Sequence, residues 1–173
     1  MYITINSGEA VTSKEEYVTC YVSVNGRGSY PHYSGKAKIR GRGNSTWEWY
    51  DKKPYRIKLD KKASILGLEA NKDWVLLANY RDVTDLMNTF VFEAGHFLDM
   101  PCTNHTRYTE VFLNGEYIGL FIESTKKFLY SRCITSTQPY RFCTQTLFLS
   151  IKNGAFIVEQ EKISYICNPN TLF

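Results

Sequence analysis

An Asn-Gly pair between two apolar stretches constrains the fold more than any other feature of the sequence. Asn114-Gly115 separates the segments 108–113 and 116–121, which are rich in aromatic and branched apolar residues. A two-residue Asn-Gly turn accommodates the positive φ angles of a type I′ turn. The sequence therefore predicts an antiparallel hairpin here, and an antiparallel sheet around it.

Further segments rich in β-branched and aromatic residues predict more strands, at 1–5, 17–24, 35–39, 54–59 and 74–78. Residues 64–68 are expected to form a short helical turn. The best helix runs from Thr84 to Leu98, with Thr84 as N-cap, apolar residues at spacings of three and four, and Pro101 as a stop. The predicted fold class is α+β, with antiparallel strands packed on one long helix.

The length of 173 residues fits one domain with a core of its own. No stretch approaches the roughly 20 apolar residues that a membrane-spanning helix needs. The amino terminus already has the pattern of a strand, so we expect any export signal to lie upstream of it. The five cysteines and three histidines are scattered without metal-ligand spacing, which indicates neither a zinc site nor a complete disulfide framework.

Positive charge is concentrated in one segment of the chain. Between Lys36 and Lys62 there are ten Lys and Arg against three acids, a net charge of +7, whereas the whole chain carries +4. A concentrated basic stretch favours an anionic partner without identifying it.

Strand periodicity places these charges on one face of the predicted sheet. Lys36, Lys38, Arg40 and Arg42 all have even numbers, so they share one side of a regular strand. The next predicted strand, 54–59, places Arg56 and Lys58 together in the same way. Two interpretations remain open. The face either binds phosphate, which offsets like charges stacked across strands, or is the solvated side of a half-buried sheet.

The loop between these two strands, 40–46, has the sequence Arg-Gly-Arg-Gly-Asn-Ser-Thr. Glycines allow backbone N–H groups to approach an anion, and the arginine fork matches phosphate geometry. The loop is neither a Walker A loop nor a GxGxxG fingerprint. A plain hairpin connection explains it equally well.

Several motifs in register resemble the spore coat protein H (CotH) kinase family over roughly residues 3–121. The motifs are Ile39-Arg40-Gly41-Arg42-Gly43-Asn44-Ser45-Thr46-Trp47, Lys52-Lys53-Pro54-Tyr55-Arg56-Ile57-Lys58-Leu59-Asp60, Lys72-Asp73-Trp74-Val75-Leu76-Leu77-Ala78-Asn79-Tyr80 and the hairpin 110–119. Members of this family are described as atypical protein kinases with a remote kinase-like fold that transfer phosphate from ATP to Ser in partner proteins. The resemblance implies ATP and Mg as cofactors, and a nucleotide and a Ser-rich protein as partners.

The resemblance also implies roles for particular residues. Lys58, or alternatively Lys53, would steady the nucleotide phosphates, together with Arg40, Arg42 and Arg56. Glu93 on the predicted helix would be the ion-pair partner of the lysine, by analogy with ordinary kinases. The alternatives are a solvated helix position for Glu93, and a structural turn at 44–47 with Trp47 packed beneath it.

The chain departs from the family pattern after the hairpin. The family continues with acidic motifs that hold metal and serve as base, but no Asp follows Asp99 here. Catalytic residues are therefore not identified, and the cysteines and histidines indicate no metal ligands. We expect residues 1–127 to be a partial CotH-like domain and 128–173 to be a divergent tail from a truncated or frameshifted gene. Such a chain would be an inactive kinase fragment, because phosphoryl transfer depends on positioned carboxylates and metal.

A different class of function is also compatible with the sequence. A non-catalytic module of a coat or cell surface could use the basic sheet face to hold anionic partners. Nucleic-acid binding is disfavoured, because the aromatic residues do not form an RNA-recognition pattern. The family suggests a spore coat, cell-surface or secreted protein, but the sequence identifies neither the compartment nor the protein substrate.

The tail generates a prediction of its own. Residues 128–173 contain only six charged residues and no clean periodicity, so we expect them to pack poorly. Limited proteolysis should cut first between about Lys126 and Arg141. Uniform resistance through Phe173 would contradict a frameshifted tail.

Overall fold

A computed structural model describes residues 1–100, 103–125, 147–152 and 155–160. The chain divides into two compact units, Met1–Ile134 and Thr135–Phe173. In the second unit, β8 (Leu147–Lys152) and β9 (Ala155–Gln160) pair as an antiparallel two-stranded sheet. The predicted boundary between residues 127 and 128, and the predicted cleavage sites, lie outside the described residues. No helix in the described part of the chain is long and apolar enough to cross a membrane.

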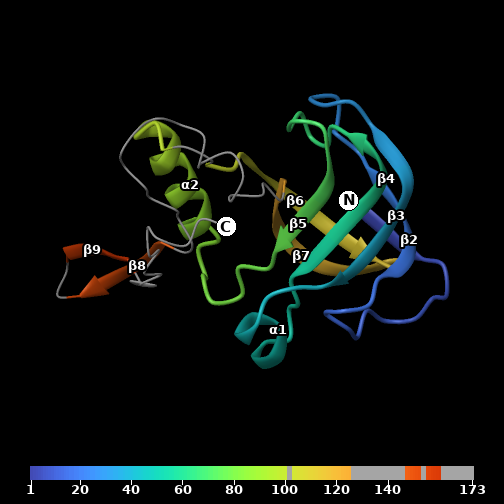
Figure 1. The fold of residues 1–173 in the computed structure, drawn as a ribbon, viewed down its shortest axis with the longest axis horizontal. Helices are drawn as coiled ribbons and strands as arrows, with labels where there is room; N and C mark the ends of the chain where they lie inside the picture. Colours follow the sequence, from blue (N-terminus) through green and yellow to red (C-terminus); the bar gives the residue numbers. More distant parts are fainter. Residues whose placement is uncertain (101–102, 126–146, 153–154, 161–173) are drawn as a thin grey trace, which may run out of the picture. The chain divides into compact units, whose positions relative to one another are not determined.

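The first unit is built around a closed barrel of seven strands (Figure 1). Its strands are β1 (Tyr2–Ile5), β2 (Val18–Val24), β3 (Tyr33–Gly41), β4 (Tyr55–Ala63), β5 (Asn71–Leu77), β6 (Thr106–Leu113) and β7 (Glu116–Thr125). They follow one another around the barrel in the order β1-β2-β3-β4-β5-β7-β6. All neighbours pair antiparallel except β1 and β6, which pair parallel and close the barrel.

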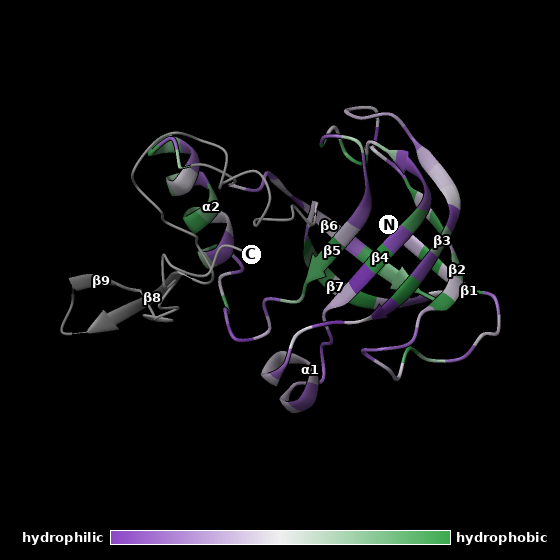
Figure 2. Cartoon of the chain, in the orientation of Figure 1, coloured by the Kyte–Doolittle hydropathy of each residue, from purple (hydrophilic) through white to green (hydrophobic). Residues whose placement is uncertain are grey.

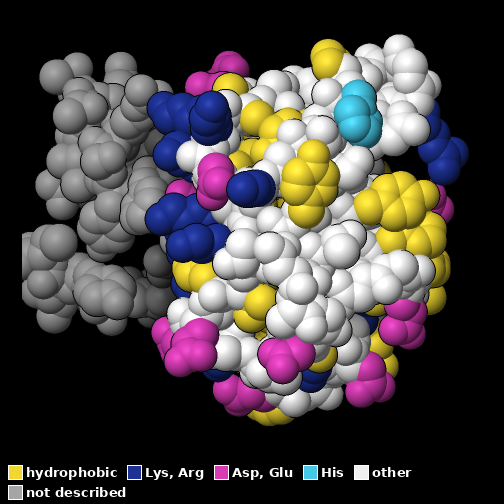
Figure 3. All heavy atoms as spheres, turned by 90° about the vertical axis from the view of Figure 1, so that its right-hand side faces the viewer, with side chains coloured by type: hydrophobic (Ala, Val, Ile, Leu, Met, Phe, Trp, Pro, Cys, Tyr) yellow, Lys and Arg dark blue, Asp and Glu magenta, His cyan; other side chains and the backbone are white. Residues whose placement is uncertain are grey.

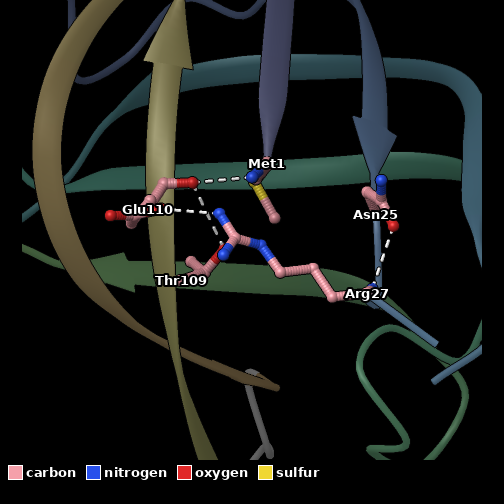
Figure 4. Close-up of polar contacts among 5 residues, drawn as sticks. All are labelled: Met1, Asn25, Arg27, Thr109 and Glu110. Atoms are coloured by element: carbon pink, nitrogen blue, oxygen red, sulfur yellow. Dashed lines mark hydrogen bonds and ion pairs between the residues drawn. The ribbon is translucent and has the colours of Figure 1, made fainter. Parts of the chain in front are cut away.

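Hydrogen bonds around Met1 and Asn114 fix this closure. The Met1 amino group donates to the Glu110 carbonyl at 2.6 Å, and the Asn114 amide donates to the Ile3 carbonyl at 2.8 Å. The Asn114 side chain in turn accepts from the Ile5 amide at 2.8 Å. Figure 4 shows Met1 and Arg27 both directed toward Glu110, whose carboxylate lies 3.4 Å from the Arg27 guanidinium. Asn114 therefore serves both the predicted hairpin turn, where its φ is 51°, and the closure of the barrel.

The core of the protein is the barrel interior. Alternate residues of every barrel strand turn inward, which appears in Figure 2 as alternating hydrophobic and hydrophilic colours along the strands. The most buried members include Ile3, Val22, Ile39, Ile57, Trp74, Leu76, Val111 and Phe121. Cys20 is a free cysteine in this core, and burial raises the pKa of its thiol to about 12.

The predicted packing of the strands on one long helix is wrong. Helix α2 (Met87–Phe97) has 11 residues, and Gly95 is its only buried residue. Phe90 and Phe97 remain 59% and 87% exposed, because the strands bury their apolar faces against one another inside the barrel. The predicted strands are confirmed as elements, whereas 64–68 forms a turn instead of a helical segment.

The start of α2 also differs from the prediction. Thr84 does not cap the helix; the Asp82 carboxylate accepts from the Met87 amide at 2.7 Å and from the Thr84 hydroxyl at 2.6 Å. These hydrogen bonds lower the pKa of Asp82, although desolvation opposes them. One carboxylate thus accepts hydrogen bonds from the first amide of the helix and from a hydroxyl of the loop before it.

A carboxylate lies inside the apolar barrel. Glu123 of β7 is fully buried on the same side of the strand as Phe121, and neither of its carboxylate oxygens has a hydrogen-bond partner among the described residues. Arg107 is its direct neighbour in register, but the Arg107 guanidinium lies over the Tyr30 ring instead. Burial raises the pKa of Glu123 to about 8, against the opposing charge of the Met1 amino group.

Glu123 should make stability depend on pH. Its pKa is about 8 in the folded protein and 4.5 in the unfolded chain. Between pH 4.5 and 8, Glu123 is therefore protonated in the folded protein and ionised in the unfolded chain. The contribution of Glu123 to the free energy of unfolding should therefore be largest below pH 4.5. It should decline as the pH rises from 4.5 through about 8, by at most about 1.4 kcal/mol per pH unit. Chemical denaturation at several pH values should show this decline in the native protein and not in Glu123→Gln.

Glu116→Gln is the matched control, because Glu116 lies exposed at the start of the same strand. It should retain the decline. An equal pH dependence in the native protein and in Glu123→Gln would show that Glu123 is not the responsible group.

Candidate phosphate-binding site

The predicted basic sheet face is present on the outside of the barrel. We use this name for Lys36, Lys38, Arg40, Arg42, Arg56 and Lys58. β3 and β4 pair so that Arg40 lies directly opposite Arg56, and Lys38 directly opposite Lys58. Between them Ala37, Ile39, Ile57 and Leu59 turn into the core. Figure 3 shows Lys and Arg side chains gathered along one edge of the barrel surface that it displays. The predicted alternation is therefore confirmed.

Two of the arginines have acidic partners. The Arg56 Nη2 and Nε atoms donate to Oδ1 of Asp73 in β5 at 2.6 and 3.2 Å. The Arg40 guanidinium lies 5.0 Å from the centre of the Tyr17 ring and 4.0 Å from the Glu15 carboxylate. Glu15 is 89% exposed, so water screens this longer contact strongly. The Arg40 Nε atom is buried without a hydrogen-bond partner among the described atoms.

Arg42 is the arginine of this face that lacks a carboxylate. It is half-buried just beyond the end of β3, and none of the ion pairs among the described residues includes it. Burial lowers the pKa of Arg42, and the positive charge of Arg56 lowers it further. The positive charge of Arg56 thus acts on Arg42, whereas Asp73 forms its ion pair with Arg56. A bound anion would relieve this repulsion.

A hollow lies beside the arginines on the same outer surface. It has a volume of about 270 Å³ and is lined by Tyr17, Lys38, Lys58, Leu59, Asp60 and Lys72. Tyr17 contributes to this hollow and also lies under Arg40. The basic sheet face therefore has an arginine end, formed by Arg40, Arg42 and Arg56. At its lysine end, Lys38 and Lys58 line the hollow together with Lys72 of β5, and Tyr17 adjoins both ends.

The glycine loop packs against Trp47, and two of its backbone amides already donate hydrogen bonds within the protein. The Gly41 amide donates to the Ser13 carbonyl at 2.8 Å, and the Arg42 amide to the Pro54 carbonyl at 3.1 Å. After Gly43, whose φ is 83°, the chain forms the short helix α1 (Ser45–Trp49). The Trp47 ring packs against Gly41 and meets Tyr55 edge-on. The structural interpretation of this loop explains its glycines, and neither the Gly41 nor the Arg42 amide is available to a phosphate.

The two lysines before β4 point to other partners. Lys53 Nζ donates to the Trp47 carbonyl at 2.7 Å, and Lys52 Nζ donates to the Leu120 carbonyl at 2.5 Å over the Phe121 ring. Burial lowers the pKa of Lys52, and the charge of Asp85 opposes this effect. The structure thus uses Lys53 to hold α1, and its predicted contact with phosphate stays a prediction.

Glu93 is exposed on α2. Neither Glu93 nor Lys58 takes part in an ion pair among the residues that the structure describes. The predicted Lys–Glu pair is therefore not formed here and remains a hypothesis.

Sequence reasoning did not identify four contributors to this site, namely Glu15, Tyr17, Lys72 and Asp73. Asp73 lies opposite Lys58 in register yet binds Arg56, two residues closer to the start of β4. The Lys72-Asp73 pair at the start of β5 was visible in the sequence. Its position depends on the β4–β5 register, which no local pattern specifies.

The described residues contain no group of three or more His, Cys, Asp or Glu side chains that could hold a metal ion. We therefore assign no step to Mg at this site.

Two comparisons with known proteins bear on these residues. The family model described as CotH kinase protein matches residues 39–128, more than half of the chain. The match begins within β3 at Ile39 and includes Arg40, Arg42, Arg56, Lys58 and Glu93. No curated protein matches the chain. The expectation of a truncated domain stays a prediction.

The packing of Trp47 on Gly41 can be tested by mutation. A methyl group at position 41 would overlap the Trp47 ring, so Gly41→Ala should lower the free energy of unfolding by about 1–3 kcal/mol. In a Trp47→Ala background the same change should cost much less, because the ring is gone. Chemical denaturation of the four proteins measures this coupling. An equal cost in both backgrounds would contradict the contact.

Proposed function

Because the chain belongs to the CotH kinase family, we propose that its basic sheet face binds the phosphates of ATP in a protein kinase. In that reaction the terminal phosphoryl group passes to a Ser hydroxyl of a partner protein, the bond to ADP breaks, and the hydroxyl proton is released. The contribution of the described residues is to bind and neutralise the phosphates. No described residue is assigned as the base.

The observation that carries this proposal is Arg42. A half-buried guanidinium next to Arg56, without a carboxylate partner among the described residues, is suited to a phosphate. Its planar fork can donate two parallel hydrogen bonds to one phosphate group. Arg40 adds a further positive charge directly opposite Arg56, with a buried Nε atom that has no hydrogen-bond partner in the described structure.

The other proposed contacts follow from the position of Lys58. Its exposed side chain lies on the same face of β4 as Arg56, two residues further along the strand. We propose that Lys58 reaches the outer phosphates once a nucleotide is bound. Glu93 of α2 would be the ion-pair partner of Lys58 in the nucleotide-bound protein, although the two form no ion pair among the described residues.

Calorimetric titration with ATP at low salt tests the proposal. The native protein should bind, and binding should weaken as salt rises, because exposed charges are screened beyond about 8 Å at physiological ionic strength. Arg42→Ala should weaken binding by about tenfold or more, the size expected for loss of a charge-assisted hydrogen bond. Arg42→Lys should recover only part of the loss, because it keeps the charge without the fork.

Lys62→Ala is the matched control, since Lys62 is an exposed residue of β4 outside the basic sheet face. It should change ATP affinity little. Absence of ATP binding in a folded protein, or equal losses in Lys62→Ala and Arg42→Ala, would refute a nucleotide site here. The face would then be a solvated sheet surface, or a binding surface for other anions.

A further inference from the structure

We propose that the lysine end of the basic sheet face, the hollow lined by Lys38, Lys58 and Lys72, binds a phosphorylated Ser side chain of the protein substrate. This inference rests on the proposed kinase function and adds a substrate class to it, namely Ser-rich segments that already carry phosphate. The hollow would hold one phosphate while a neighbouring Ser receives the next.

The size and charge of the hollow favour this ligand. Its volume of about 270 Å³ is smaller than the roughly 300–1,000 Å³ typical of pockets that enclose whole small molecules. Three lysines against Asp60 leave a net lining charge of +2. A phosphoserine carries about −1.5 to −2 at neutral pH. A single phosphate monoester therefore matches the hollow in charge, and the hollow is smaller than the pockets that usually enclose whole small molecules.

The lysines of the hollow have acidic neighbours but form no ion pair among the described residues. Lys38 and Lys58 are directly opposite one another across β3 and β4, an arrangement that is unfavourable for like charges. None of the ion pairs among the described residues includes Lys38, Lys58 or Lys72, whereas Arg40 and Arg56 each have an acidic partner. Asp73 lies opposite Lys58 in register on β5, but its carboxylate contacts Arg56.

The walls of the hollow are not only charged. Tyr17 contributes an aromatic side chain. This ring can contact the peptide around the phosphate, whereas free phosphate can use only the lysines. A phosphopeptide should therefore bind more tightly than inorganic phosphate.

The arrangement of the two ends explains why this site would be useful to a kinase. Tyr17 lies under Arg40 and also lines the hollow. Arg56 and Lys58 point outward from the same strand two residues apart, about 7 Å at the usual rise of a strand. A phosphoserine at the lysine end would therefore hold the adjacent residues of its peptide near a nucleotide at the arginine end.

The experiment is a calorimetric titration of the whole chain, without nucleotide, using a short Ser-rich peptide with one phosphoserine. The unphosphorylated peptide, the same peptide with Glu in place of phosphoserine, and inorganic phosphate are the comparison ligands. We expect the phosphopeptide to bind most tightly. Lys38→Ala and Lys72→Ala should each weaken it about threefold and together about tenfold, with Lys62→Ala as the unaffected control.

The outcomes separate this inference from the nucleotide site. Binding of ATP without binding of the phosphopeptide overturns the inference and leaves the kinase proposal standing. Loss of phosphopeptide binding in Arg42→Ala but not in the two lysine variants also overturns it, because the phosphate would then occupy the arginine end. Tighter binding of a single-stranded oligonucleotide than of the phosphopeptide would assign the hollow to nucleic acid instead.

Discussion

Strands β1 and β6 pair in parallel through only Tyr2 opposite Phe112 and Ile3 opposite Leu113, and this short pairing closes the barrel. The Met1 amino group and the Asn114 side chain reinforce it with hydrogen bonds to Glu110 and Ile5. Closure removes the exposed edges that an open sheet would present. It also gives every strand one inner and one outer face, so the apolar alternate residues must share a single interior.

The basic sheet face is a consequence of that closure. The apolar residues of β3 and β4 point into the barrel, namely Ala37, Ile39, Ile57 and Leu59. Because side chains alternate along a strand, the lysines and arginines between them lie on the outer surface. The register then places like charges in direct opposition at Arg40–Arg56 and Lys38–Lys58. Among the described residues, Glu15 and Asp73 form ion pairs with Arg40 and Arg56, whereas no ion pair includes Arg42, Lys38 or Lys58. A bound anion would offset the repulsion among these charges.

Local patterns predicted the strands and the direction of the basic residues, because strand periodicity depends on each segment alone. The glycine loop could be predicted only as two alternatives; the contact between Trp47 and Gly41 supports the structural one, and a contact of the loop with phosphate stays a prediction. The barrel itself was missed, since a parallel β1–β6 pairing between residues more than a hundred positions apart leaves no trace in either strand. The apolar residues of α2 suggested a helix packed on a sheet, yet Phe90 and Phe97 lie exposed while the barrel forms the core without them. Asp73 and Lys72 were missed for the same reason as the barrel, because their neighbours depend on long-range register.

We expect anions to bind the outer surface of β3 and β4, and a nucleotide to bind at its arginine end. Backbone amide chemical shifts of the isotope-labelled protein, followed by NMR during titration with ATP, test this residue by residue. The largest changes should lie at Arg40, Arg42 and Arg56. Tyr2, Phe112 and Tyr117, an aromatic cluster on β1, β6 and β7, should change little. Largest changes at that aromatic cluster, or changes spread evenly over the barrel, would contradict this expectation.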